Sequence, residues 1–115
     1  MMERHNGLDA VFDALAGARR REIVLALGRQ PRSISQLAAM QDMSLPAIHK
    51  HIRVLEDAGL VIRRKFGRTT ILALRRGPLG ALQDWVLQFH PYWGDERETL
   101  ENYAQAMGND HRSDD

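Results

Sequence analysis

The sequence predicts a mainly α-helical fold with one small β-hairpin. Three observations lead to this prediction. Apolar residues recur at helical spacing along most of the chain, glycines stand where two of the helices should end, and two short β-type stretches flank a Gly-Arg pair. We expect about five to six helices and a two-stranded hairpin within one domain over residues 1–107. The segment 108–115 lacks apolar residues, so we expect it to be a disordered tail.

The first two helices are predicted from apolar spacing and differ in charge. The first carries apolar residues at positions i, i+3, i+4 and i+7, namely Leu8, Val11, Phe12 and Leu15. We expect Asn6 to cap this helix and Gly17 to end it. The second covers residues 19–27 and opens with three arginines. Cations there oppose the helix dipole, so residues 19–21 indicate contact with an outside partner such as a DNA backbone, or else a solvated basic face.

Two capped helices joined by a tight turn are predicted over residues 33–58. Ser33 can cap the first of them, and Ser44 can cap the second, which we expect to reach Ala58. Gly59 then supplies a left-handed stop. The second helix has a buried stripe formed by Leu45, Ile48, Ile52 and Leu55. This arrangement is a helix-turn-helix.

A β-hairpin is predicted directly after the second of these helices, over residues 60–75. The pair Gly67-Arg68 suits a type II′ turn, which favours glycine at its first central position. Such a turn pairs Phe66 with Thr69, and it places the apolar residues at the base of the hairpin. The basic residues crowd toward the tip, and they are Arg63, Arg64, Lys65 and Arg68. A basic hairpin in this position is a wing, so the sequence predicts a winged helix-turn-helix.

The C-terminal segment, residues 78–107, has a helical pattern and is rich in aromatic side chains. We expect a break near residues 90–95, where Pro91 and Gly94 interrupt the pattern, and a restart capped by Asp95. These aromatic residues could cover the domain's own core, but their large area favours helix pairing across a two-fold axis. The sequence thus predicts a homodimer through the first and last helices. The expected interface residues are Leu8, Val11, Phe12, Trp85, Phe89, Tyr92, Trp93, Leu100 and Tyr103.

The charge of the chain is divided unevenly along its length. The formal net charge of the whole chain is only +1. Residues 1–76, however, carry 14 basic and 7 acidic side chains, whereas residues 77–115 carry 2 basic and 8 acidic ones. This asymmetry indicates a body that faces a polyanion, with a separate acidic segment.

Several classes of function are excluded by what the 115 residues lack. There is no cysteine, which excludes disulfides, thiolate metal sites and cysteine nucleophiles. No apolar run approaches the length of a membrane span, and the polar N-terminus is unlike a signal peptide, so we expect a cytoplasmic protein without a membrane partner. No phosphate-binding glycine loop or nucleophile motif occurs. We therefore expect neither an enzyme nor a cofactor.

The candidate DNA-binding residues lie on the second helix of the helix-turn-helix and on the wing. At 100° per residue, the helix face opposite the apolar stripe presents its N-terminal half to a major groove. Lys50 or Arg53 could donate to guanine, and Ser44 could hold a phosphate. An ordinary solvated helix face is the alternative. The full set is Ser44, Pro46, Ala47, His49, Lys50, Arg53, Arg63, Arg64, Lys65, Arg68 and Thr69.

A metal site at the His49-x-His51 pair is not expected. Residues two apart on a helix point about 200° from one another, so one ion cannot easily bridge them. A zinc site also needs three or four ligands. We expect His49 to contact DNA and His51 to lie at the flank or the edge of the core.

The segment Ser44-Leu-Pro-Ala-Ile-His-Lys-His-Ile, continued by Leu55-Glu-Asp-Ala-Gly-Leu-Val61, resembles the ArsR-type winged helix-turn-helix repressors of bacteria. The resemblance extends over about residues 8–107 and also includes Phe12-Asp-Ala-Leu-Ala, Arg20-Arg21, Ser35-Gln-Leu-Ala38 and the wing turn. It implies a dimeric repressor that binds double-stranded DNA at an inverted-repeat operator. A winged-helix module that binds an acidic protein is the alternative.

Two departures from the family pattern concern its metal sites. Where the metal-sensing branch carries a cysteine pair, this chain has Ser33 and Ser35. The other metal site of that branch lies on the C-terminal helix, where only Asp84 and His90 are candidates, and these are six residues apart. The chain is therefore more similar to the branch without metal ligands, and the sequence names no effector.

Overall fold

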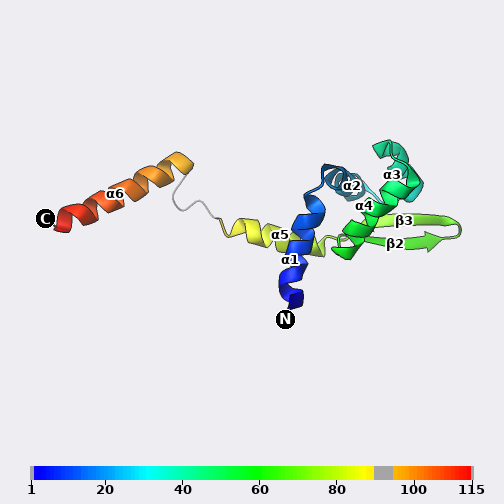
Figure 1. Ribbon diagram of the computed structural model, residues 1–115, viewed down its shortest axis with the longest axis horizontal. Coiled ribbons are helices and arrows are strands. Elements are labelled where there is room, and N and C mark those ends of the chain that lie inside the picture. The colour runs from blue at the N-terminus through cyan, green and yellow to red at the C-terminus, as the bar shows by residue number, and fades with distance from the viewer. Residues whose placement is uncertain (1, 90–94, 115) are drawn as a thin grey trace. The chain divides into compact units, whose positions relative to one another are not determined.

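The computed structural model describes residues 2–89 and 95–114, with side chains described for residues 7–89 and 95–108. The described residues form six helices and three strands (Figure 1). They are α1 (Met2–Leu15), α2 (Ala18–Arg29), β1 (Arg32–Ser33), α3 (Ile34–Gln41), α4 (Leu45–Asp57), β2 (Val61–Phe66), β3 (Thr69–Leu74), α5 (Gly77–Leu87) and α6 (Glu96–Asp114). The chain divides into two units, residues 1–85 and 86–115, whereas the sequence predicts one domain over 1–107.

The predicted winged helix-turn-helix is confirmed in the first unit, where α3 and α4 precede the β2–β3 hairpin. The capping residues act as expected. The Ser33 hydroxyl accepts from the backbone N–H of Gln36 at 3.0 Å, and the Gln36 side chain accepts from the Ser33 N–H at 2.9 Å. The Ser44 hydroxyl accepts from the N–H of Ala47 at 3.3 Å. Between the two helices the chain turns at Asp42, whose φ of 53° lies in the left-handed region.

The hairpin has the predicted register. Phe66 pairs with Thr69 and Arg64 with Ile71, in antiparallel strands. Gly67 has a φ of 62°, and Arg68 is not among the residues with positive φ, as a type II′ turn requires. The sheet has a third strand that the sequence does not predict, because β1 pairs with β3 in the order β1-β3-β2. Two residues are too few to show the alternation by which a strand is recognised in sequence.

The core of the first unit is built from one stripe of each of the helices α1 to α4 and from the base of the hairpin. Its fully buried large side chains are Val11, Ile23, Leu37, Ile48, Ile52, Leu55, Leu60 and Leu72. The assignment of Val11 to a dimer interface is wrong, since this side chain is only 1% exposed and packs inside its own core. Helix α1 also begins at Met2, so Asn6 is not its cap.

The second unit contains the end of α5 and the whole of α6. The carboxylate of Asp95 accepts from the N–H of Glu98 at 2.9 Å, which confirms Asp95 as the predicted cap. Helix α6 continues through residues 108–114, where the sequence predicts a disordered tail. The absence of apolar residues there removes packing, but no proline interrupts the helical hydrogen bonds. The sequence predicts a break near residues 90–95, and residues 90–94, which include Tyr92 and Trp93, lie outside the described residues.

Candidate nucleic-acid interface

Helix α4 has one fully buried face and one exposed face. Ile48, Ile52 and Leu55 are buried completely in the core. The exposed face carries the predicted contact residues Pro46, His49, Lys50 and Arg53, whereas Ala47 is half-buried. Successive residues of a helix are 100° apart, so the buried stripe leaves the basic side chains pointing outward. A small hollow of about 160 Å³ is lined by His49, Lys50 and Arg53. These three side chains thus share one patch of surface.

The first turn of α4 contains no acidic residue. Its N-cap is Ser44, whose hydroxyl oxygen accepts a backbone hydrogen bond and whose own hydrogen is left to donate. The positive end of the helix dipole lies at the same place. This end of α4 is therefore suited to an anionic group such as a phosphate.

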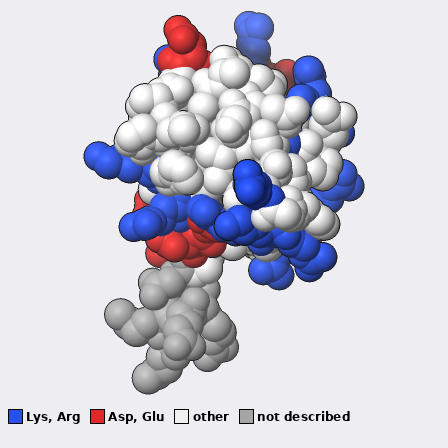
Figure 2. Space-filling model, turned by 90° about the vertical axis from the view of Figure 1, so that its right-hand side faces the viewer, with Lys and Arg blue, Asp and Glu red and all other residues white. Residues whose placement is uncertain are grey.

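The wing adds further cations in exposed positions. Arg64, Lys65 and Arg68 are exposed, as is Thr69 beside the turn. Phe66 is also exposed, which the sequence does not predict. Figure 2 shows the wing end of the molecule, where Lys and Arg side chains gather across the lower half of the face. The surface near the wing is thus predominantly positive.

Arg63 differs from the other wing cations because it is paired. Its guanidinium donates to both carboxylate oxygens of Glu56, from Nε and Nη2, each at 2.7 Å. The hydrogen bonds to Glu56 are the main reason that the pKa of Arg63 is raised above its usual value. Since Glu56 lies near the end of α4, this pair ties strand β2 to the helix. The charge of Arg63 is thus partly compensated within the chain, and its contact with DNA stays a prediction.

The three arginines that open α2 are used inside the first unit. Arg20 donates to the carbonyl oxygens of Ala14 at 2.6 Å and Asp13 at 3.2 Å, at the end of α1. Arg21 donates to the carbonyl oxygens of Leu15 and Ala16, at 2.8 and 3.0 Å. These carbonyls lie at and just beyond the C-terminal end of α1, at the negative end of its dipole, and that of Asp13 also accepts from the backbone N–H of Ala16 at 3.3 Å.

Arg19 acts in the same way on another helix. Its Nη1 donates at 2.7 Å to the carbonyl oxygen of Gln41, the last residue of α3. The expectation that residues 19–21 indicate an outside partner is therefore corrected, because their guanidinium groups cap two helix ends of the chain itself.

His51 lies at the junction of α4 with these arginines. Its Nδ1 is 3.4 Å from Nη1 of Arg20. Partial burial lowers the pKa of His51, and the positive charges of Arg20 and Arg19 lower it further. The ring is thus held in its neutral form, in which Nδ1 can accept from the guanidinium. This agrees with the predicted place of His51 at the edge of the core.

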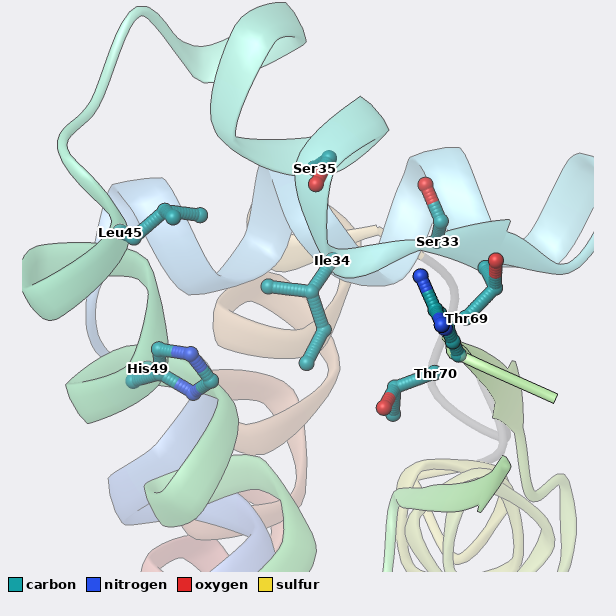
Figure 3. Close-up of a pocket in the computed structure, with 8 residues that line it drawn as sticks. Ser33, Ile34, Ser35, Leu45, His49, Thr69 and Thr70 are labelled. Carbon is teal, nitrogen blue, oxygen red and sulfur yellow. The ribbon is translucent and has the colours of Figure 1, made fainter. Parts of the chain in front are cut away.

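A larger hollow of about 410 Å³ separates the helix-turn-helix from the wing. One side is formed by the start of α3 and by α4, and the other by the wing. Figure 3 shows His49 on one wall, Thr69 and Thr70 across from it, and Ile34 between them. Ser33, Ser35, Leu45 and Arg68 complete the lining. The sequence does not predict that Ser35 and Thr70 belong to this site, because only the folded sheet brings β3 beside α3.

The residues predicted for a dimer interface differ in their exposure, since some pack within their own chain and others are exposed. Phe12 and Trp85 pack edge to face, with ring centroids 5.3 Å apart and planes at 80°, so Trp85 partly covers helix α1 of its own chain. Leu8 is half-buried. Phe89, Leu100 and Tyr103 are exposed, and α5, which is described throughout, contains no buried residue.

The described residues offer neither a metal-binding group nor a membrane-spanning helix. Among residues 2–89 and 95–114, no group of three or more His, Cys, Asp or Glu side chains could hold a metal ion. No helix in the same part of the chain is long and apolar enough to cross a membrane. The geometry defines a winged helix-turn-helix of the kind that transcriptional regulators use to bind DNA.

Comparison with known proteins identifies the family. Residues 18–63 match the family described as bacterial regulatory protein, arsR family. The chain is 32% identical over 106 residues to the HTH-type transcriptional regulator Rv2034 of Mycobacterium tuberculosis, and the match covers 92% of this chain and 94% of that protein. The protein therefore belongs to the ArsR family of DNA-binding transcriptional regulators. The name of this relative is that of a regulator and not of an enzyme.

Two solved structures show the same fold. The ArsR-like transcriptional regulator from Rhodococcus sp. RHA1 superposes with a TM-score of 0.73 at 28% identity, over 92% of this chain and 97% of that one. The homodimeric winged helix-turn-helix domain Mb0332 from Mycobacterium bovis gives a TM-score of 0.65 at 25% identity, over 77% and 85%. These neighbours favour the DNA-binding interpretation over a protein-interaction module.

Proposed function

We propose that this regulator is a homodimeric repressor that occupies an inverted-repeat operator and blocks access to a promoter. The observation that carries the proposal is the exposed patch of His49, Lys50 and Arg53 on α4, beside a wing with three exposed basic residues, Arg64, Lys65 and Arg68. A recognition helix reads base edges in the major groove, while a flanking basic element holds the backbone.

The contacts divide by chemistry. Lys50 and His49 lie in the N-terminal half of α4, so they read base edges, with Arg53 as a further donor one turn along. Ser44, Arg64, Arg68 and Thr69 hold phosphates. The hollow between α3 and the wing extends the second group, because its hydroxyl residues Ser35 and Thr70 lie near Arg68.

The dimer is supported by exposed apolar surface and by a relative. Phe89, Leu100 and Tyr103 are large side chains left exposed in the single chain. Exposed apolar residues in such number favour an interface with a second copy. The relative Mb0332 is described as homodimeric. The acidic segment 77–115 suits this role as well, because it would be repelled by DNA and would face away from it.

A salt titration of duplex binding tests the proposal. If each subunit contacts three or four phosphates, a dimer neutralises roughly 6–8, and log K should fall with log salt at a slope of about −5 to −7. The operator itself can be found by selection from a random duplex pool. A palindromic consensus is expected, and a consensus without two-fold symmetry would contradict the inverted-repeat part of the proposal.

A further inference from the structure

An aromatic side chain occupies the tip of the wing, where the chain itself does not cover it. Phe66 is the last residue of β2, and its side chain is 60% exposed. At about 3.3 Å per residue, it lies roughly 16 Å along the strand from Val61, which is buried in the core. Figure 1 shows that the tip of the hairpin reaches beyond helices α2, α3 and α4. Phe66 is therefore not part of the hydrophobic core of the first unit.

The surroundings of Phe66 are basic and polar. Lys65 precedes it, Arg68 follows it in the turn, and Thr69 pairs with it across the hairpin, and all three are exposed. A Cβ atom at Gly67 would meet nothing within 4 Å, so the turn itself is open to close approach by a ligand. An exposed ring among cations matches a ligand that has negative charges around an apolar interior. Duplex DNA is such a ligand, because its phosphates flank stacked bases.

The hollow between the helix-turn-helix and the wing indicates which groove of a duplex the tip would meet. This hollow, of about 410 Å³, is lined by Ser35 and His49 on one side and by Arg68 and Thr70 on the other (Figure 3). Hydroxyl and guanidinium groups donate to phosphate oxygens, so the hollow suits the backbone of one DNA strand when α4 lies in the major groove. The minor groove lies on the other side of that backbone. The tip of the wing would therefore meet the minor groove.

We propose that Phe66 inserts between two base pairs from the minor groove and thereby determines part of the operator specificity, an inference that rests on the DNA-binding function proposed above. Apolar side chains that insert in this way partly unstack one base step and kink the duplex. Pyrimidine–purine steps such as TA and CA are easily unstacked, whereas runs of adenine are stiff. Phe66 thus selects a flexible base step without forming a hydrogen bond to it.

The first test compares two operators and three proteins. A pyrimidine–purine step is expected in the selected operator, within the minor groove that the wing protects from hydroxyl-radical cleavage. Replacing this step by AA should weaken binding of the wild type by about tenfold. Phe66→Thr keeps a β-branched residue in the strand but removes the ring, so it should bind both operators with the same, reduced affinity. The control is Ile62→Thr, the same replacement on the same face of β2 but near its base, and it should behave as the wild type.

A fluorescent base analogue detects the insertion itself. When 2-aminopurine replaces the adenine of the flexible step, its fluorescence should rise on binding of the wild type, because unstacking relieves quenching. Phe66→Leu retains an apolar side chain of the kind that can insert, so it should preserve part of this rise, whereas Phe66→Thr should abolish it. These measurements separate insertion from support of the hairpin, since a purely structural role would not change the fluorescence of one base.

The outcomes for the two proposals are distinct. Specific binding by the wild type without a rise in fluorescence, or with the same step preference in Phe66→Thr, would overturn the insertion of Phe66 and leave the regulator's DNA binding intact. Loss of affinity in Phe66→Thr with a lowered melting temperature and an unchanged step preference would likewise assign Phe66 to hairpin stability. Failure of the wild type to select any duplex would overturn the proposed function together with this inference.

Discussion

At the scale of single residues, we expect the proposed interface to divide into side chains that read bases and side chains that hold phosphates. Lys50→Ala and His49→Ala should each reduce discrimination between operator and random DNA, by about 1–3 kcal/mol if the lost contact is a good base contact. Arg64→Ala and Arg68→Ala should weaken binding to all sequences and make the salt dependence shallower, because they remove phosphate neutralisation. Binding isotherms on both kinds of duplex at two salt concentrations separate the two effects. Equal losses from both sets on both duplexes would contradict this division.

We expect Arg20 to stabilise the fold, because its guanidinium donates to carbonyl groups at the end of α1. Arg20→Ala removes the side-chain donor from the carbonyls of Ala14 and Asp13 and should lower the free energy of unfolding by about 1–3 kcal/mol. Arg20→Lys should recover only part of this, since an ammonium cannot reproduce the planar fork of donors. Urea unfolding measures both changes, with exposed Arg29→Ala as the control. A variant with unchanged stability and weakened DNA binding would instead support contact of Arg20 with the DNA backbone.

Gly17 is part of the same arrangement. A Cβ atom at this position would lie 2.8 Å from Cζ and Nη2 of Arg20. The guanidinium packs so closely because it must reach back over Gly17 to the end of α1. The glycine that the sequence assigns to ending a helix therefore also admits the side chain that caps it.

At the scale of elements, the junction of α1, α2 and α4 should depend on pH through His51. The pKa of His51 is lowered in the folded protein from an ordinary value of 6.5, so the unfolded chain binds the proton more readily. The stability that this neutral ring contributes is fully present above about pH 6.5. It declines as the pH falls from 6.5 through the lowered pKa of the folded state.

Urea unfolding between pH 5 and pH 8 measures this dependence. His51→Asn keeps an acceptor beside Arg20 but does not titrate, so its stability should decline less over the same range. His49→Asn is the matched control, because His49 is exposed and lies on the outer face of the same helix. If wild type and His51→Asn show parallel pH profiles, the histidine does not carry the effect.

The elements also show which parts of the fold are predictable from sequence. The caps at Ser33 and Ser44 and the turn at Gly67 are local, since each depends on residues within three or four positions, and all three are confirmed. Strand β1 depends on pairing with β3 about forty residues away, which a two-residue pattern does not reveal. Helix caps and tight turns can therefore be predicted from the sequence, whereas the pairing of strands that are distant in the chain cannot.

The candidate site follows the same rule. Periodicity on α4 predicts the outward face of Lys50 and Arg53, because helix geometry alone determines it. The roles of Arg63 and Arg20 depend on Glu56 and on the end of α1, which lie beside them only after folding. The composition of the chain does not distinguish these arginines. The structure does, because it shows which of them have hydrogen-bond partners within the chain and which are exposed.

At the scale of the whole molecule, we expect dimerisation and operator binding to be coupled. A two-fold dimer presents two recognition helices about 34 Å apart, one turn of DNA, so that a single half-site binds weakly. Trp85→Ala combined with Phe89→Ala removes aromatic area from α5 and the residues that follow it. The double variant should be monomeric. Its affinity for the operator should fall far more than its affinity for random DNA, because only the operator has two half-sites that both subunits of a dimer can bind at once.

Sedimentation analysis and operator titration of the same samples measure the two properties together. Leu25→Ala is a suitable control, because Leu25 is as exposed as Phe89 but lies on α2. Trp85 already packs against Phe12 in its own chain, so circular dichroism of the double variant must first show an unchanged helical spectrum. If the folded double variant stays dimeric and keeps full operator affinity, these aromatic residues serve the single chain, and the interface lies elsewhere on its surface.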